Sequence, residues 1–298
     1  MFFKKLVSIF TAGILIISLV SSSVFAVSRG NLQKYVFSEY DYIVSIRKMS
    51  KSKLDKMDLS SSEKQLICSD QIENEIMDRK KQSDDVLMKY YGYTADEIAI
   101  LRSYNGGRLE DHKELRAITG TLTIDTPIVM QSTAQKIAVK VYWDWDHQPI
   151  VNMKDAFCAT WSATFKNGKY GNLIFDKSQS NHIIWYTPGG VSASKKVPIQ
   201  NTVPDRAVKS EFPMTSADGR FWARSGTFNL YLKSAANDVS IASVSFVFAY
   251  GHTTLVFSPS VSFDSSGLGV GISFGFGTSQ ADLISGYVKA DGKNKWNY

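Results

Sequence analysis

The sequence has few of the residues on which metal and nucleophilic chemistry depend. It contains two cysteines and four histidines in 298 residues, and none of them stand at the close spacing of a metal site. No serine lies in a Gly-x-Ser-x-Gly elbow, and no glycine-rich phosphate loop connects a strand to a helix. These absences argue against catalysis, and we expect no cofactor and no resident metal.

Long apolar runs are also scarce, and the one near the N-terminus is short. Residues 6–20 follow Lys4 and Lys5, are interrupted by Thr and Ser, and precede small and apolar residues ending at Ala26. A basic start, an apolar stretch and such a cleavage position are the three parts of a secretion signal. We expect residues 1–26 to be a signal peptide, cut near Ala26, and the mature chain to be extracellular; an uncleaved anchor is the alternative.

The charge balance is only mildly basic. The formal net charge is +6, and removing Lys4 and Lys5 with the signal leaves +4. The sequence has no basic stripe with interleaved aromatic residues, so we expect no nucleic-acid partner. A mild excess suits an anionic surface, so we expect a cell-surface partner, either anionic lipid or polysaccharide. The oligomeric state stays open.

The two cysteines, Cys68 and Cys158, allow two interpretations. In an oxidising compartment they would pair, and a bridge closing so long a loop stabilises by ~4 kcal/mol in the chain-entropy model. Alternatively, both are buried free thiols. The sequence does not decide between these states.

The first part of the mature chain, residues 27–116, has helical character. It is dense in Lys, Asp and Glu, and capping boxes at Ser60 with Glu63 and at Thr94 with Glu97 open two helices. The helix after the first box has a narrow apolar stripe, so we expect it on a surface rather than in a core.

Past Leu115 the helical period gives way to strict alternation. The segments "QKIAVKVYWDW" and "DAFCATWSATF" place Trp, Phe, Val and Ala at every second position, and Gly-containing turns separate such segments. We therefore predict an α+β protein in which the helical segment precedes an antiparallel β-sandwich over residues 117–298.

The segment between residues 255 and 276 alternates apolar with small polar residues on both sides of a turn. Its arms, 255–263 and 268–276, are nine residues long, and Asp264 is its only charge. Nine residues are about the length that a tilted strand needs to cross a bilayer, and this alternation is typical of membrane strands. The apolar positions are Leu255, Phe257, Val261, Phe263, Leu268, Val270, Ile272, Phe274 and Phe276.

The same hairpin also fits an ordinary sheet. Its apolar face would then turn toward an opposing sheet, and Pro259, which cannot donate to a ladder, suits an edge strand. The N-terminal helices would cover its Gly/Ser face. We favour the sheet interpretation, and the membrane interpretation stays open.

The densest polar cluster of the β region is the strand end "WDWDHQP". Asp144 and Asp146 share a strand face, with His147 at the exit, and they are weak candidates for a calcium site or a secreted hydrolase. A calcium loop would add acids at short spacing, whereas Gln148 and Pro149 follow here. A solvated strand end is the interpretation we favour.

Aromatic residues suggest a carbohydrate-binding class. Trp185, Tyr186, Trp222, Trp296 and Tyr298 would form a platform on which sugars stack if they were exposed. If they are buried, they fill a core instead.

The motifs "YGYTADEIAILRSYNGG", "YWDWDHQP" and "AFCATWSATF" resemble a group of secreted proteins from Gram-positive bacteria. The overall plan is also similar to that of secreted protein bacteriocins of the geobacillin type. The resemblance implies export, a helical N-terminal region and a β-sandwich, and it implies no active site.

Taken together, these features indicate a secreted, non-catalytic protein. We expect binding or antagonism at a cell surface, and a bacteriocin-like or membrane-active role through residues 255–276 is one form that this function could take. A carbohydrate-binding β-sandwich module is the alternative, followed by a secreted hydrolase.

Overall fold

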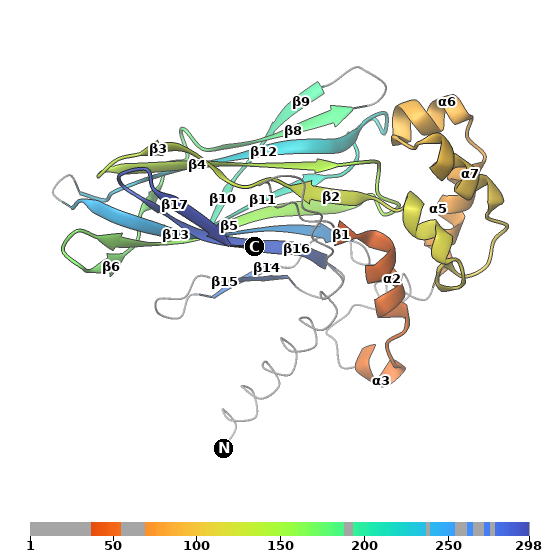
Figure 1. Cartoon of the computed structure of the whole chain (residues 1–298), viewed down its shortest axis with the longest axis horizontal. Coiled ribbons are helices and arrows are strands. Elements are labelled where there is room, and N and C mark those ends of the chain that lie inside the picture. The colour runs from red at the N-terminus through yellow and green to blue at the C-terminus, as the bar shows by residue number, and fades with distance from the viewer. Residues whose placement is uncertain are drawn as a thin grey trace.

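The protein is an α+β molecule dominated by antiparallel strands (Figure 1). Its sheets are open rather than closed. The computed structural model describes residues 37–54, 69–187, 193–236, 239–253, 261–264, 271–274 and 278–297.

Short helices come before nearly all of the strands. The helices are α2 (Glu39–Arg47), α3 (Lys51–Leu54), α5 (Gln71–Lys80), α6 (Asp84–Val86) and α7 (Ala95–Ser103), with a π-helical turn Leu87–Tyr91 and 3-10 turns Leu109–Asp111 and Lys113–Ile118. The capping box of Thr94 and Glu97 is confirmed at the start of α7. The box of Ser60 and Glu63 lies outside the described residues. None of the described helices combines the length and apolar character needed to cross a bilayer.

The expectation that the helix containing Ile72 and Ile76 lies on a surface holds for one side, where Gln71, Asn74 and Asp78 are exposed, but is wrong in excluding the helix from a core. Both side chains of α5 are buried, at 4% and 0% exposure, in a small core shared with α2 and α7. The reason is Arg79, which is buried and yet donates to Tyr93 Oη at 2.7 Å and to the carbonyl of Gln148 at 2.8 Å. A charged side chain can face the interior when it is fully hydrogen-bonded, so the buried face of α5 is wider than its apolar stripe.

The first large sheet has the strand order β1-β2-β4-β12-β8-β9, with β3 also paired to β4 and β7 to β12. Its strands are β1 (Phe37–Ser38), β2 (Thr121–Ile124), β3 (Ile128–Ser132), β4 (Lys136–Trp145), β7 (Ile174–Phe175), β8 (Asn181–Thr187), β9 (Ala193–Val197) and β12 (Trp222–Lys233).

The second large sheet has the order β10-β11-β5-β13-β16-β17, with β6 paired to β5. Its strands are β5 (Lys154–Phe165), β6 (Tyr170–Gly171), β10 (Gln200–Val203), β11 (Ala207–Pro213), β13 (Ile241–Thr253), β16 (Thr278–Lys289) and β17 (Asn294–Asn297). A separate hairpin consists of β14 (Val261–Asp264) and β15 (Gly271–Phe274).

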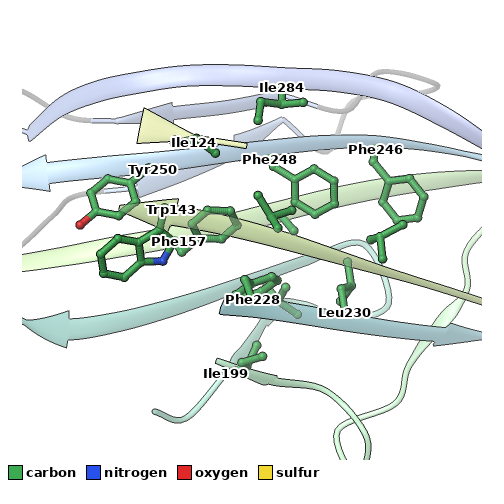
Figure 2. Packing of buried hydrophobic residues seen from close by; sticks show 14 of the residues in the cluster. Ile124, Trp143, Phe157, Ile199, Phe228, Leu230, Phe246, Phe248, Tyr250 and Ile284 are labelled. Carbon is green, nitrogen blue, oxygen red and sulfur yellow. The ribbon is translucent and has the colours of Figure 1, made fainter. Parts of the chain in front are cut away.

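Side chains from both large sheets meet in one shared core (Figure 2). Phe157 of the second sheet stacks on Phe228 of the first, with ring centroids 4.7 Å apart. Trp143 of the first sheet stacks on Phe212 of the second at 5.2 Å. Successive strand residues point to opposite faces, so the two-residue period buries one half of each strand and leaves the other half for the outer faces.

Candidate functional site

The candidate site is the β14–β15 hairpin, which lies on the outer face of the second sheet. Within the described part of the chain, its two strands pair only with each other. Ile272 and Phe274 are buried, at 5% and 3% exposure, and Val261 and Phe263 are half-buried in the same cluster. Figure 1 shows the hairpin beside β5, β13 and β16, on the side away from the first sheet.

Small residues form the surface that receives the hairpin. The cluster beneath it consists of Ala156, Cys158, Val247 and Ala249. A Cβ placed on Gly251 would lie 2.3 Å from Cε1 of Phe274, so the ring occupies the space that a larger residue would fill. The hairpin therefore approaches β13 closely because position 251 has no side chain.

The opposite face of the hairpin is polar and open. Ser262 and Ser273 are exposed and stand opposite each other, with their Oγ atoms 2.6 Å apart. The described helices gather around their own core, to which no hairpin residue belongs. Among the described residues, helices therefore do not cover this polar face.

The remaining positions of the expected membrane hairpin cannot be placed. Leu255, Phe257, Leu268, Val270 and Phe276 lie outside the described residues. The site consequently rests on the four apolar side chains of β14 and β15.

Cys158 lies beneath the hairpin as a buried free thiol. Burial raises the pKa of this thiol far above its usual range, so it is unreactive while it stays covered. Cys68, its expected partner in a disulfide, lies outside the described residues. Cys158 is therefore a natural reporter of whether the hairpin is docked.

A fully buried ionic network stands where β13 ends, directly before residue 254. Asp155 of β5 accepts from Tyr250 Oη at 2.6 Å, from His252 Nδ1 at 2.9 Å and from the amide of Thr253 at 3.1 Å. The hydroxyl of Thr253 donates to the carbonyl of Lys154. The last residues of β13 are thus fastened to the beginning of β5.

The helical region joins this network through Glu39 of α2. Its carboxylate accepts from the amides of Ile150 and Val151, both at 2.7 Å, and lies 3.6 Å from His252 Nε2. The uncharged rings of Phe37 and Trp145 complete the surroundings of the imidazole.

Electrostatics keep His252 protonated. Burial lowers the pKa of His252, but the carboxylates of Asp155 and Glu39 outweigh it and raise the value to about 9. Burial and the nearby Asp155 raise the pKa of Tyr250 well above its usual value, so its hydroxyl stays a donor. The result is an imidazolium between two carboxylates, with no solvent contact. This arrangement holds charge in place and offers no access for a substrate.

Sequence reasoning missed this network because its members are far apart in the chain. The available signal was Asp155 itself, a carboxylate directly before the alternating segment "AFCATWSATF". A charge at such a position requires a partner. The sequence does not reveal that the partners are Glu39 and His252.

Of the weak metal candidates, Asp146 and His147 pair, with His147 Nδ1 3.0 Å from Asp146 Oδ1, but no third ligand among the described residues joins them. Asp146 Oδ1 accepts from the amides of Thr121 and His147, at 2.8 and 2.7 Å, and His147 is buried against Tyr93. Asp144 is exposed on the outer face of the first sheet. Within the described residues, no group of three or more His, Cys, Asp or Glu side chains is placed to hold a metal ion.

The expected aromatic platform is dispersed. Tyr186 and Trp222 are buried, at 4% and 1% exposure, and Trp296 packs beside Phe246. Tyr298 lies outside the described residues. Of the set, Trp185 remains as a half-buried residue on an outer face.

Comparisons with known proteins add little. No protein-family model and no curated protein matches the sequence. A solved structure described as "AvmM Catalyzes Macrocyclization in Alchivemycin A Biosynthesis" aligns with a TM-score of 0.27 and 8% identity, over 55% of this chain and 87% of that chain. A likeness of this size carries no argument about function.

Proposed function

We propose that this protein is a secreted, non-catalytic antagonist that acts on the membrane of another cell through the β14–β15 hairpin. One observation carries the proposal. Among the described residues, the hairpin has no backbone pairing to the sheet beneath it and rests there on its apolar face. Burying one Ile or Phe side chain contributes about 1.5–3 kcal/mol, which contact with another apolar surface such as a bilayer can replace.

The register of the neighbouring strands also supports release of the hairpin. β13 and β16 pair antiparallel as far as Thr253 opposite Thr278. If the hairpin is released, the chain between Thr253 and Thr278 can extend this pair of strands, with apolar residues at alternate positions of its sequence. Apolar residues would then share one face of a long hairpin, as membrane strands require. Hairpins from several copies would pair edge to edge into a closed barrel, which leaves no unpaired strand edge in the lipid.

The remaining parts of the proposal come from the sequence. The N-terminal 26 residues have the features of a secretion signal, and the mature chain keeps a formal charge of +4, which favours anionic lipid. Resemblance to secreted proteins of Gram-positive bacteria and to geobacillin-type bacteriocins agrees with export and antagonism. We also propose that the mature chain consists of a helical segment from residue 27 followed by a β-sandwich.

Dye leakage from anionic vesicles tests this function. The mature protein at micromolar concentration should release dye, and Ile272→Asp should abolish release because a charge on the apolar face cannot enter hydrocarbon. The matched control is Ser273→Asp, in the same strand but on the exposed face, which should keep most of the leakage.

Two results would count against membrane action. One is absence of leakage by the wild-type protein while it binds the vesicles. The other is equal loss of leakage in Ile272→Asp and Ser273→Asp with both variants folded, because the two faces of the hairpin would then be equivalent.

A further inference from the structure

A cleft opens on the outer face of the first sheet, the face that points away from the hairpin. Its volume is about 270 Å³. Its lining includes aromatic rings, two carboxylates and the hydroxyls of Thr123 and Ser225. The residues that line it include Thr123, Asp125, Tyr142, Asp144, Trp185 and Ser225.

Strand register places these side chains together. Asp144 of β4 stands opposite Thr123 of β2 and Ser225 of β12, and Ser225 stands opposite Trp185 of β8. Residues directly opposite each other point to the same side of a sheet, so four adjacent strands contribute to one row. Tyr142 stands two residues before Asp144 and shares its face.

The rigid backbone of the sheet holds this row in place. Trp143, between Tyr142 and Asp144, is 1% exposed and locked in the core, where its Nε1 donates to His182 Nε2 at 3.1 Å. Burial lowers the pKa of His182 to about 3, so the ring stays neutral and accepts this bond. The outward neighbours of Trp143 are therefore presented in fixed positions.

We infer that this cleft binds a neutral sugar unit of a cell-surface polysaccharide. The C–H face of a sugar packs on a flat ring such as that of Trp185, while Lys140 Nζ lies over the ring of Tyr142, 5.5 Å from its centroid. The sugar hydroxyls donate to Asp125 and Asp144 and exchange hydrogen bonds with Thr123 and Ser225. Two carboxylates, Asp125 and Asp144, outnumber the one ammonium beside the cleft, that of Lys140, which disfavours phosphate-bearing and other anionic ligands.

The size of the cleft limits what it takes. Pockets for drug-sized ligands occupy about 300–1,000 Å³, and the volume here is slightly below that range. The cleft therefore suits one sugar of a chain that continues into solvent. This inference adds a recognition site to the proposed function and does not depend on membrane insertion.

Retention on insoluble polysaccharides tests the inference. The mature protein would be mixed with cellulose, with chitin and with peptidoglycan sacculi stripped of anionic polymers. At least one of them should retain the wild-type protein. Trp185→Ala should weaken binding about tenfold or more, which corresponds to about 1.4 kcal/mol, and Trp185→Tyr, which keeps a ring, should retain most of the affinity. Asp144→Asn should weaken binding severalfold.

The matched control is Tyr170→Ala, which removes a ring that is 61% exposed on the other large sheet. It should bind like the wild-type protein. Failure of all three polysaccharides to retain the wild-type protein would overturn the inference. Retention of Trp185→Ala as strong as that of the wild-type protein would also overturn it. Trp185→Ala should release dye from pure lipid vesicles at the wild-type rate. Loss of polysaccharide binding and loss of membrane leakage are therefore distinguishable.

Discussion

A disulfide that fastens the hairpin to β13 should abolish vesicle leakage, and its reduction should restore leakage. Gly251 and Phe274 are the positions to join, because the Phe274 ring fills the space directly above Gly251. Gly251→Cys with Phe274→Cys places two thiols where the ring was. Cys68→Ser and Cys158→Ser in the same protein remove the two natural thiols, so the introduced pair at positions 251 and 274 are its only thiols.

The experiment compares one protein in two redox states. Mass spectrometry would establish that the bridge has formed, and leakage would be measured before and after adding dithiothreitol. The protein carrying only the two serine substitutions controls for any effect of the reductant on the vesicles. Leakage by the bridged protein at the rate of the reduced protein would show that the hairpin need not leave the sheet.

Replacing Asp155 by Asn should destabilise the fold by about 3–5 kcal/mol, the usual consequence of removing one partner from a buried ionic pair. The carboxylate accepts hydrogen bonds from three residues, Tyr250, His252 and Thr253. An amide keeps one acceptor oxygen and leaves the imidazolium with a single carboxylate, that of Glu39, at 3.6 Å. Urea unfolding at pH 6 measures the loss.

The pH dependence of stability supplies the second readout of the same network. The folded-state pKa of His252 is raised from 6.5 to about 9, so its stabilisation is fully present below pH 6.5 and is lost as the pH rises through 9. A shift of this size corresponds to about 3 kcal/mol. The free energy of unfolding should therefore fall over this range in the wild-type protein, and the decline should be much shallower in Asp155→Asn.

The control for both readouts is Asp218→Asn. Asp218 pairs with Arg220 on a surface turn, and such exposed pairs contribute little, so unfolding should hardly change. If Asp155→Asn behaved like this control at pH 6 and kept the wild-type pH slope, the network would not hold the end of β13.

Alternation along the chain was enough to predict β4 and β5 and the burial of Trp143 and Trp161 within them. "QKIAVKVYWDW" became β4 and "DAFCATWSATF" became β5, with Trp143 and Trp161 at 1% exposure. This signal is local, because the period of a strand is set by its own backbone. The capping box at Thr94 is predictable for the same reason.

Features that depend on distant residues were not predictable. The apolar face of the hairpin can be recognised in the sequence, but the surface that receives it depends on the absence of a side chain at Gly251. The ionic network joins residues 39, 155 and 252, and no short motif connects them. The aromatic platform failed because sequence alone does not tell Trp185, at the surface, from Trp222, in the core.

The reactivity of Cys158 tests most directly whether the hairpin leaves the sheet. Maleimide labelling of Cys68→Ser protein, followed by mass spectrometry, would report this one thiol. In buffer the thiol should be protected, because it is buried beneath Ile272 and Phe274. Gly251→Ala should raise the rate, since its Cβ collides with the Phe274 ring. On adding anionic vesicles to the Cys68→Ser protein, Cys158 should become labelled as leakage begins. Leakage while Cys158 stays as protected as in buffer would contradict release of the hairpin.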